Sequence, residues 1–201
     1  MRQPMNLYHA VGITRPMILR SVGTIQAVFA ISACVVGGSI AAAPAAHAAD
    51  RRVCERAAVK KLLQSRPIYR QAKKNDGGLA AVKCLRIDDD TRYDALFAIF
   101  SGGTAGNIAW GAARGGPSGH GALIKLTTSH SQLGVGIRQT EIGPVPAIAY
   151  PVFRPGDGNC CASGGFVIQT YDWLDGTLQP STRTKAKHFP PGFDARPRAD
   201  G

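Results

Sequence analysis

Acidic residues are scarce in this sequence, which holds 13 Asp and Glu against 24 Lys and Arg, a formal charge of +11 at pH 7. None of the acidic residues lies in residues 1–48, so residues 49–201 keep 21 Lys and Arg and a formal charge of +8. This balance favours anionic partners, such as acidic cell-wall polymers and lipid headgroups. Nine of the cations lie in residues 51–74 and five in residues 183–198.

The sequence also lacks the short motifs of common catalytic and cofactor sites. No G-K-[ST] follows "SGGTAG" at 101–106, which excludes a P-loop and favours a hairpin turn. No G-x-S-x-G elbow and no C-x-x-C pair is present. We therefore expect no cofactor, and a binding or structural domain rather than an enzyme. An extracellular hydrolase using Ser101 with His120 or His130 stays an alternative, since a catalytic triad is recognised by its geometry.

Residues 1–48 have the layout of a secretory signal peptide, with a basic start, an apolar run and an A-x-A site at 46–48. We predict cleavage after this site, export of the chain, and no stable transmembrane segment after processing. The "ISAC" context of Cys34 is similar to a lipobox, so lipid anchoring through Cys34 is an alternative. The apolar Val35 and Val36 that follow it favour secretion.

Residues 51–64 predict one amphipathic helix. Its apolar positions recur every four residues, at Cys54, Ala58 and Leu62. A second row at the same spacing is cationic and consists of Arg52, Arg56 and Lys60. We identify this row as a candidate surface for anionic ligands, with a solvated face as the alternative. Residues 67–74 predict another short helix that begins at a proline.

From residue 81 onwards, short apolar runs separated by glycine predict an antiparallel sheet. The strand candidates are residues 81–87, 93–101, 106–114, 121–128, 133–139, 147–153, 166–173 and 174–180. The last two form a hairpin with a tight turn at Asp175-Gly176. We predict a single α+β domain at 49–180, with the N-terminal helix packed on one antiparallel meander sheet of about six or seven strands. Residues 181–201 are expected to form a disordered basic tail.

After loss of the signal peptide four cysteines remain, which predicts two disulfides in an oxidising compartment. They are Cys54, Cys84, Cys160 and Cys161. A bond between adjacent residues is geometrically unfavourable, because disulfides prefer a wider Cα separation than neighbours have. We therefore expect Cys160 and Cys161 to bond separately to Cys54 and Cys84. A bond between Cys160 and Cys161, with Cys54 joined to Cys84, is the third possible connectivity.

Residues 87–94, "IDDDTRYD", place Asp88, Asp90 and Asp94 at a spacing similar to acidic calcium loops. Thr91 occupies the position where such loops carry glycine, and no distal glutamate follows. These three carboxylates are weak calcium candidates. A solvated acidic turn between two strands is the favoured interpretation.

Two segments give the chain its resemblance to known proteins, "SGGTAG" at 101–106 and "YPVFRPGDGNCCASGGF" at 150–166. With them the chain resembles a group of uncharacterised exported actinobacterial proteins over most of residues 51–180, and more distantly the mycobacterial LppP/LprE lipoproteins. The group often has an acidic D-x-T-x-D-G-x-x-D segment before the "DALF" strand. Arg86 takes its first acidic place here, so three of four carboxylates remain. The resemblance implies export and no particular activity.

Together these features predict a secreted binding or structural domain of the cell envelope, braced by two disulfides. Its expected partners are anionic cell-wall polymers or lipid surfaces, and not nucleic acid. A hydrolase, or a thiol-redox protein using the adjacent cysteines, is the alternative. The ligand and the oligomeric state stay open at this point.

Overall fold

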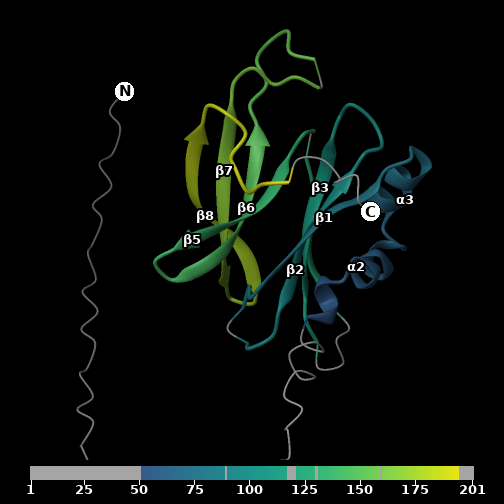
Figure 1. Cartoon of the computed structure of the whole chain (residues 1–201), viewed down its shortest axis with the longest axis vertical. Coiled ribbons are helices and arrows are strands. Elements are labelled where there is room, and N and C mark those ends of the chain that lie inside the picture. Colours follow the sequence, from purple (N-terminus) through teal and green to yellow (C-terminus); the bar gives the residue numbers. More distant parts are fainter. Residues whose placement is uncertain (1–50, 89, 117–120, 130, 159, 195–201) are drawn as a thin grey trace, which may run out of the picture. The chain divides into compact units, whose positions relative to one another are not determined.

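The computed structural model describes residues 51–88, 90–116, 121–129, 131–158 and 160–194. The predicted signal peptide and Cys34 lie outside these residues. The helical elements are η1 (Arg52–Cys54), α2 (Arg56–Leu63) and α3 (Pro67–Lys74). The strands are β1 (Gly78–Leu85), β2 (Asp94–Phe100), β3 (Asn107–Arg114), β4 (Ala122–Thr128), β5 (Gly134–Thr140), β6 (Gly143–Pro151), β7 (Phe166–Leu174) and β8 (Thr177–Ala186) (Figure 1).

The strands form two antiparallel sheets, each with its strands in chain order. Sheet A contains β1 to β4 and sheet B contains β5 to β8. The prediction of antiparallel strands that pair with their chain neighbours is therefore confirmed. The prediction of one sheet with six or seven strands is wrong, because the chain leaves sheet A after β4 and begins a second sheet at β5.

Strand β2 shows why a single sheet with helices on one face could not bury all the apolar side chains. Leu96 and Ala98 pack in the core between the two sheets, whereas Phe97 and Ile99 pack against the helices. Successive side chains of a strand point to opposite faces, so a strand that is apolar at every position needs cover on both sides. The helices supply one cover and sheet B supplies the other.

The helices form one layer on the outer face of sheet A (Figure 1). The predicted helix at 51–64 is divided, because Glu55 has an extended backbone between η1 and α2. Val59, Leu63 and Tyr69 supply the buried side chains that pack on the sheet. Helix α3 begins at Pro67, as predicted, since proline lacks the N–H that the first helical turn leaves unpaired.

The C-terminal segment differs from the disordered tail expected at 181–201. Strand β8 continues to Ala186, and the segment after it packs Phe189 and Phe193 on the outer face of sheet B. A Cβ at Gly134 would lie 2.5 Å from the Phe189 ring, and one at Gly136 would lie 2.7 Å from the Phe193 ring. The two glycines of β5 therefore leave room for two aromatic rings. Residues 195–201 lie outside the described part of the chain.

The disulfides join Cys54 to Cys84 and Cys160 to Cys161. Two disulfides are as predicted, but the expected pairing of Cys160 and Cys161 with the other two cysteines is wrong. Cys84 lies near the end of β1, beside the end of β6 that holds Pro144 and Pro146. The adjacent cysteines follow the opposite end of β6, a nine-residue strand that spans roughly 30 Å. Their loop returns to β7 at that end of the sheet, where they bond to each other.

Candidate ligand-binding cleft

A cleft of about 750 Å³ opens between the two sheets where β1 and β7 end and β5 turns into β6. Eight of its sixteen lining residues are aliphatic and three are aromatic. The lining residues are Cys84, Leu85, Arg86, Ile87, Asp88, Tyr93, Ile137, Gln139, Ile142, Pro144, Val145, Pro146, Tyr171, Asp172, Trp173 and Leu174. They come from four separate parts of the chain, so the two-sheet arrangement is what brings them together.

Strand β5 shows how the sandwich core becomes a cleft. Its inward-facing residues run from Val135, which is buried, through the half-buried Ile137 to the exposed Gln139. Strand β7 repeats this gradient, because Tyr171 is buried and Trp173 is half-buried. The packed interior therefore ends within the length of these strands, and beyond it apolar side chains face the solvent.

Two exposed apolar residues stand at the mouth of the cleft. Ile142 is 82% exposed in the β5–β6 turn, and Leu174 is 54% exposed where β7 enters the turn to β8. Asp175 and Gly176 have φ angles of 51° and 76°, so the tight turn predicted there is confirmed. In the described residues Val152 is the other large hydrophobic residue that is exposed. Hydrophobic exposure thus concentrates at this opening, as in interaction sites.

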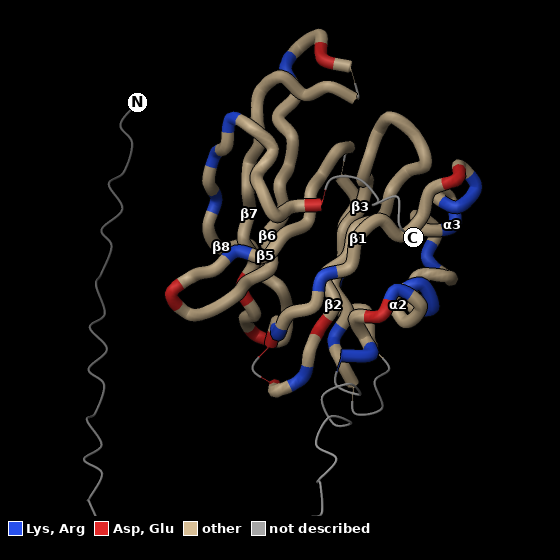
Figure 2. The backbone as a smooth tube through the Cα atoms, in the orientation of Figure 1, with Lys and Arg blue, Asp and Glu red and all other residues tan. Residues whose placement is uncertain are grey.

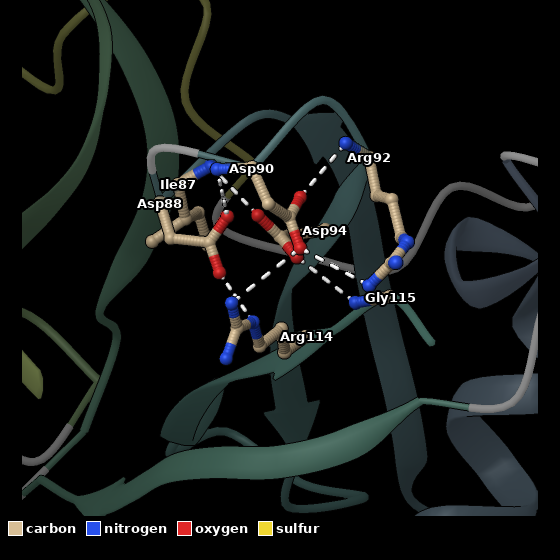
Figure 3. Close-up of polar contacts among 7 residues, drawn as sticks. All are labelled: Ile87, Asp88, Asp90, Arg92, Asp94, Arg114 and Gly115. Atoms are coloured by element: carbon tan, nitrogen blue, oxygen red, sulfur yellow. Dashed lines mark hydrogen bonds and ion pairs between the residues drawn. The ribbon is translucent and has the colours of Figure 1, made fainter. Parts of the chain in front are cut away.

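Asp94 anchors the loop that forms one wall of the cleft. The Ile87 N–H donates a hydrogen bond to Asp94 Oδ2 over 2.7 Å, and the Gly115 N–H donates one to Oδ1 over 2.9 Å (Figure 3). Asp94 is fully buried. Burial raises the pKa of its carboxyl group, and the nearby Asp88 and Asp90 add to the rise, whereas the two N–H groups oppose it. This residue is structural, since it joins the 87–94 loop to the end of β3.

Arginine side chains neutralise the other two carboxylates of the loop. Asp88 forms an ion pair with Arg114, and Asp90 lies 3.4 Å from Arg92 and 3.5 Å from Arg114 (Figure 3). Burial opposes ionisation of Asp90, but the Arg92 N–H, Asp88 and the two guanidinium groups lower its pKa. We propose no calcium site here, because protein groups occupy all three carboxylates. No group of three metal-ligating side chains occurs within the described ranges.

A hydrogen-bonded aromatic cluster closes the inner end of the cleft. Trp110 Nε1 donates to Tyr150 Oη over 2.8 Å, and Tyr150 Oη lies 2.9 Å from Tyr171 Oη. Burial raises the pKa of both tyrosines, and in Tyr171 the hydrogen bond and the charge of Tyr150 raise it further. Both phenols are therefore neutral at neutral pH. A satisfied polar network of this kind holds its aromatic rings in one arrangement.

The predicted cationic row divides into different roles. Arg56 donates to the carbonyl oxygens of Leu79 over 2.6 Å and Ala80 over 3.1 Å, where the β1 register shifts. It therefore caps the irregular part of an edge strand. Arg52 and Lys60 are exposed, as are the other Lys and Arg residues of 51–74, and Figure 2 shows the Lys and Arg positions gathered along α2 and α3.

The residues of the hydrolase alternative do not form a described site. Ser101 Oγ accepts a hydrogen bond from the Gly103 N–H over 3.2 Å, as in a tight turn. His120 and His130 lie outside the described residues. The alternative therefore gains no support from the geometry.

No protein-family model matches the chain, and searches of curated proteins and of solved structures found no match either. Membership of the exported actinobacterial group thus stays a prediction. Of the helices described, none is sufficiently long and apolar to cross a membrane. Sequence reasoning missed the cleft altogether. The signals that could have indicated it are the decline from Val135 to Gln139 and the isoleucine in the turn at 141–142.

Proposed function

We propose that this protein is an extracytoplasmic binding domain of the cell envelope, and that its ligand is a small amphipathic molecule held in the cleft between the sheets. The observation that carries the proposal is the opening of an apolar, aromatic-lined cleft between Ile142 and Leu174. The signal-like N-terminus and the even number of cysteines after it support export.

The dimensions and lining of the cleft favour a small molecule over a protein partner. Its volume of about 750 Å³ lies in the range of small-molecule sites, which are mainly apolar with a few polar groups. The polar lining residues include Arg86 and Gln139. The apolar body of a ligand would pack on Leu85, Ile137 and Trp173.

Gln139 and Arg86 supply the polar end of the site. Gln139 follows Val135 and Ile137 on the inward face of β5, and Arg86 is exposed with its guanidinium group 5.1 Å from the Tyr93 ring centre. An amide and a guanidinium group both donate hydrogen bonds, which favours a ligand with a hydroxyl or carboxylate head. An ammonium head would face repulsion from Arg86.

Tryptophan fluorescence can test ligand binding directly. The chain has two tryptophans, of which Trp110 is buried and Trp173 lines the cleft. Submicellar decylamine, decanol and decanoate are suitable probes, because they share one apolar body and differ in the head. We expect the alcohol or carboxylate to change the emission, the amine to bind more weakly, and Trp173→Phe to abolish the response.

A matched pair of variants connects binding to the cleft. Ile142→Ser removes an exposed apolar side chain at the mouth, and Val152→Ser removes one in the β6–β7 loop. We expect Ile142→Ser to weaken binding about tenfold, since a loss of about 1.4 kcal/mol of apolar contact corresponds to that factor. Val152→Ser should bind as the wild type does. Equal effects of the two variants, or absence of binding by every probe, would contradict the proposal.

The cationic surface supports a second function, attachment to anionic polymers or lipids. The motivating observation is that residues 51–76 hold nine exposed Lys and Arg residues against two acidic residues, Glu55 and Asp76. An electrostatic contact of this kind weakens as salt increases. The test is cosedimentation with vesicles of equal parts phosphatidylglycerol and phosphatidylcholine, at low salt and at about 0.5 M salt.

Charge reversal on two different elements locates the contact. We expect Lys60→Glu with Lys61→Glu to remove most of the low-salt binding, because both residues are exposed on α2. Arg183→Glu with Lys185→Glu changes the charge equally on the exposed β8 edge and should preserve binding. Equal losses would show a response to net charge and would contradict a specific helical surface.

A further inference from the structure

The loop between β6 and β7 carries an exposed disulfide between adjacent residues. Cys160 and Cys161 are both exposed. Cys54 and Cys84, by contrast, are half-buried, and Cys54 packs with the apolar cluster between the helices and sheet A. Reagents in the solvent therefore have better access to Cys160–Cys161 than to Cys54–Cys84.

The Cys160–Cys161 bond braces no part of the fold. The stabilisation that a disulfide supplies through the unfolded chain grows with the number of residues in the closed loop. Cys54 and Cys84 are 30 residues apart and join η1 to β1, whereas Cys160 and Cys161 are separated by one position. The second bond thus links no two elements and closes no segment of chain.

Other contacts hold the loop in shape without this bond. The Val152 N–H donates to Gly165 O over 2.9 Å, which closes the base of the loop. Asp157 Oδ2 accepts hydrogen bonds from the Arg154 N–H over 2.6 Å and the Ser163 N–H over 2.8 Å. These two N–H groups lower the pKa of Asp157, so the carboxylate that organises the loop is ionised at neutral pH. The disulfide can open while the loop keeps its base.

We propose that Cys160–Cys161 is a thiol–disulfide exchange site that takes two electrons from a dithiol reductant outside the cytoplasm. One thiolate of the reductant attacks a sulfur of the pair, so that a mixed disulfide forms and the other cysteine leaves as a thiolate. The second thiolate of the reductant then attacks its own sulfur in the mixed disulfide and releases the first cysteine. The reductant becomes a disulfide, the pair becomes two thiols, and the two protons of the reductant pass to them.

Three features of the structure favour this pair over the other bond as the reacting one. Both of its sulfur-bearing residues are exposed, which exchange requires for in-line attack. Its Cα separation of 3.8 Å is below the usual span of disulfides, a departure that makes such bonds more reducible. Its opening separates no elements of the fold. This inference is independent of the cleft and its ligand.

Selective reduction tests the proposal, with Cys54–Cys84 as the internal control. The protein purified after export is incubated with increasing dithiothreitol, quenched with N-ethylmaleimide and analysed by peptide mass spectrometry. We expect labels on Cys160 and Cys161 at a reductant concentration roughly tenfold below the one that labels Cys54 and Cys84. A pair that stays closed until Cys54–Cys84 opens would overturn the proposal. So would mapping that finds Cys160 and Cys161 bonded elsewhere.

A trapping experiment tests the mixed disulfide itself. A dithiol reductant protein that lacks its second cysteine cannot complete the exchange and should stay bound to Cys160 or Cys161. The variant Cys160→Ser with Cys161→Ser should capture none, and Cys54→Ser with Cys84→Ser should capture as much as the wild type. Absence of capture by the wild type, or capture that depends on Cys54 and Cys84, would contradict the exchange site.

Discussion

Lys83 Nζ lies 2.8 Å from Asp194 Oδ2, and this ion pair joins β1 of sheet A to the chain segment that covers sheet B. Asp194 also exchanges backbone hydrogen bonds with Val135 of β5, and its carbonyl oxygen accepts a bond from Asn107 Nδ2 over 3.1 Å. Three strands from both sheets therefore meet one residue near the end of the described chain. The segment after β8 is part of the sandwich.

Removal of this segment should destabilise the domain. A chain that ends at Ala186 lacks Phe189, Phe193 and Asp194, and loss of one buried Phe side chain commonly costs 3 kcal/mol or more, so we expect a loss of at least about 3 kcal/mol. Chemical denaturation of the exported protein measures the free energy of unfolding. The full-length protein is the reference. A shortened chain as stable as the full-length protein would contradict the packing of this segment.

Alanine at Gly136 should disturb the same packing from the other side. The added Cβ would lie 2.7 Å from the Phe193 ring, closer than carbon atoms approach, so the ring must move and we expect a loss of about 1–3 kcal/mol. Gly103→Ala is the matched control, since no atom lies within 4 Å of its added Cβ. Thermal unfolding of both variants compares them. A Gly136→Ala protein as stable as Gly103→Ala would show that the ring does not occupy this position.

Asparagine at Asp94 should remove an acceptor that two N–H groups share. Its amide would place a donor opposite either the Ile87 or the Gly115 N–H, and an unsatisfied buried donor costs about 1–3 kcal/mol. Asp175→Asn is the control, because Asp175 is exposed in a turn at φ 51°, a conformation that asparagine also adopts. The free energy of unfolding in urea measures both changes.

The pH dependence of the Asp94→Asn effect has a definite sign. A carboxyl group with a raised folded pKa binds more protons in the folded state, so its contribution to stability is largest below the unfolded pKa of about 3.9. That contribution falls as pH rises through the folded pKa. The stability difference between wild type and Asp94→Asn should therefore shrink as the pH rises from about 3 to about 6. A difference that grows over this range would mean that the folded pKa is not raised.

Removal of Cys54–Cys84 should destabilise the fold much more than removal of Cys160–Cys161. Cys54→Ser with Cys84→Ser opens a loop of 30 residues, and the chain-entropy relation gives a loss of about 3–4 kcal/mol. Cys160→Ser with Cys161→Ser opens no loop, so the free energy of unfolding should change by less than about 0.5 kcal/mol. Denaturation of both double variants under oxidising conditions makes the comparison. Similar losses would show that the adjacent cysteines brace the fold after all.

Local pattern was sufficient to predict most elements of the fold. Short apolar runs separated by glycine placed strands at 93–101 and 106–114, where β2 and β3 lie, because strand formation there depends on nearby residues. The Asp175-Gly176 turn was predicted for the same reason, since its φ angles suit glycine and aspartate. The division into two sheets was not predicted. It depends on how many faces must be buried together, which is a property of the assembled layers.

The candidate sites also separate into features that nearby residues predict and features that depend on distant residues. The acidic spacing at 87–94 favoured a solvated turn, with calcium as the weaker interpretation, and it could not reveal that Arg114 of another strand pairs with Asp88 and Asp90. Tail composition indicated disorder, and it could not reveal that Gly134 and Gly136 leave space for Phe189 and Phe193. In both segments the contact that was not predicted is with a residue distant in the chain.

By itself the sequence determined the excess of positive charge, the number of cysteines and the positions of most strands. It also predicted an export signal. Each of these depends on composition or on residues within a few positions. The tertiary structure decided which cysteines bond, which carboxylates meet arginines and where the cleft opens. Those outcomes depend on side chains that approach each other only when two sheets pack face to face. The packing stops before the ends of β5 and β7, and the cleft is the space that remains.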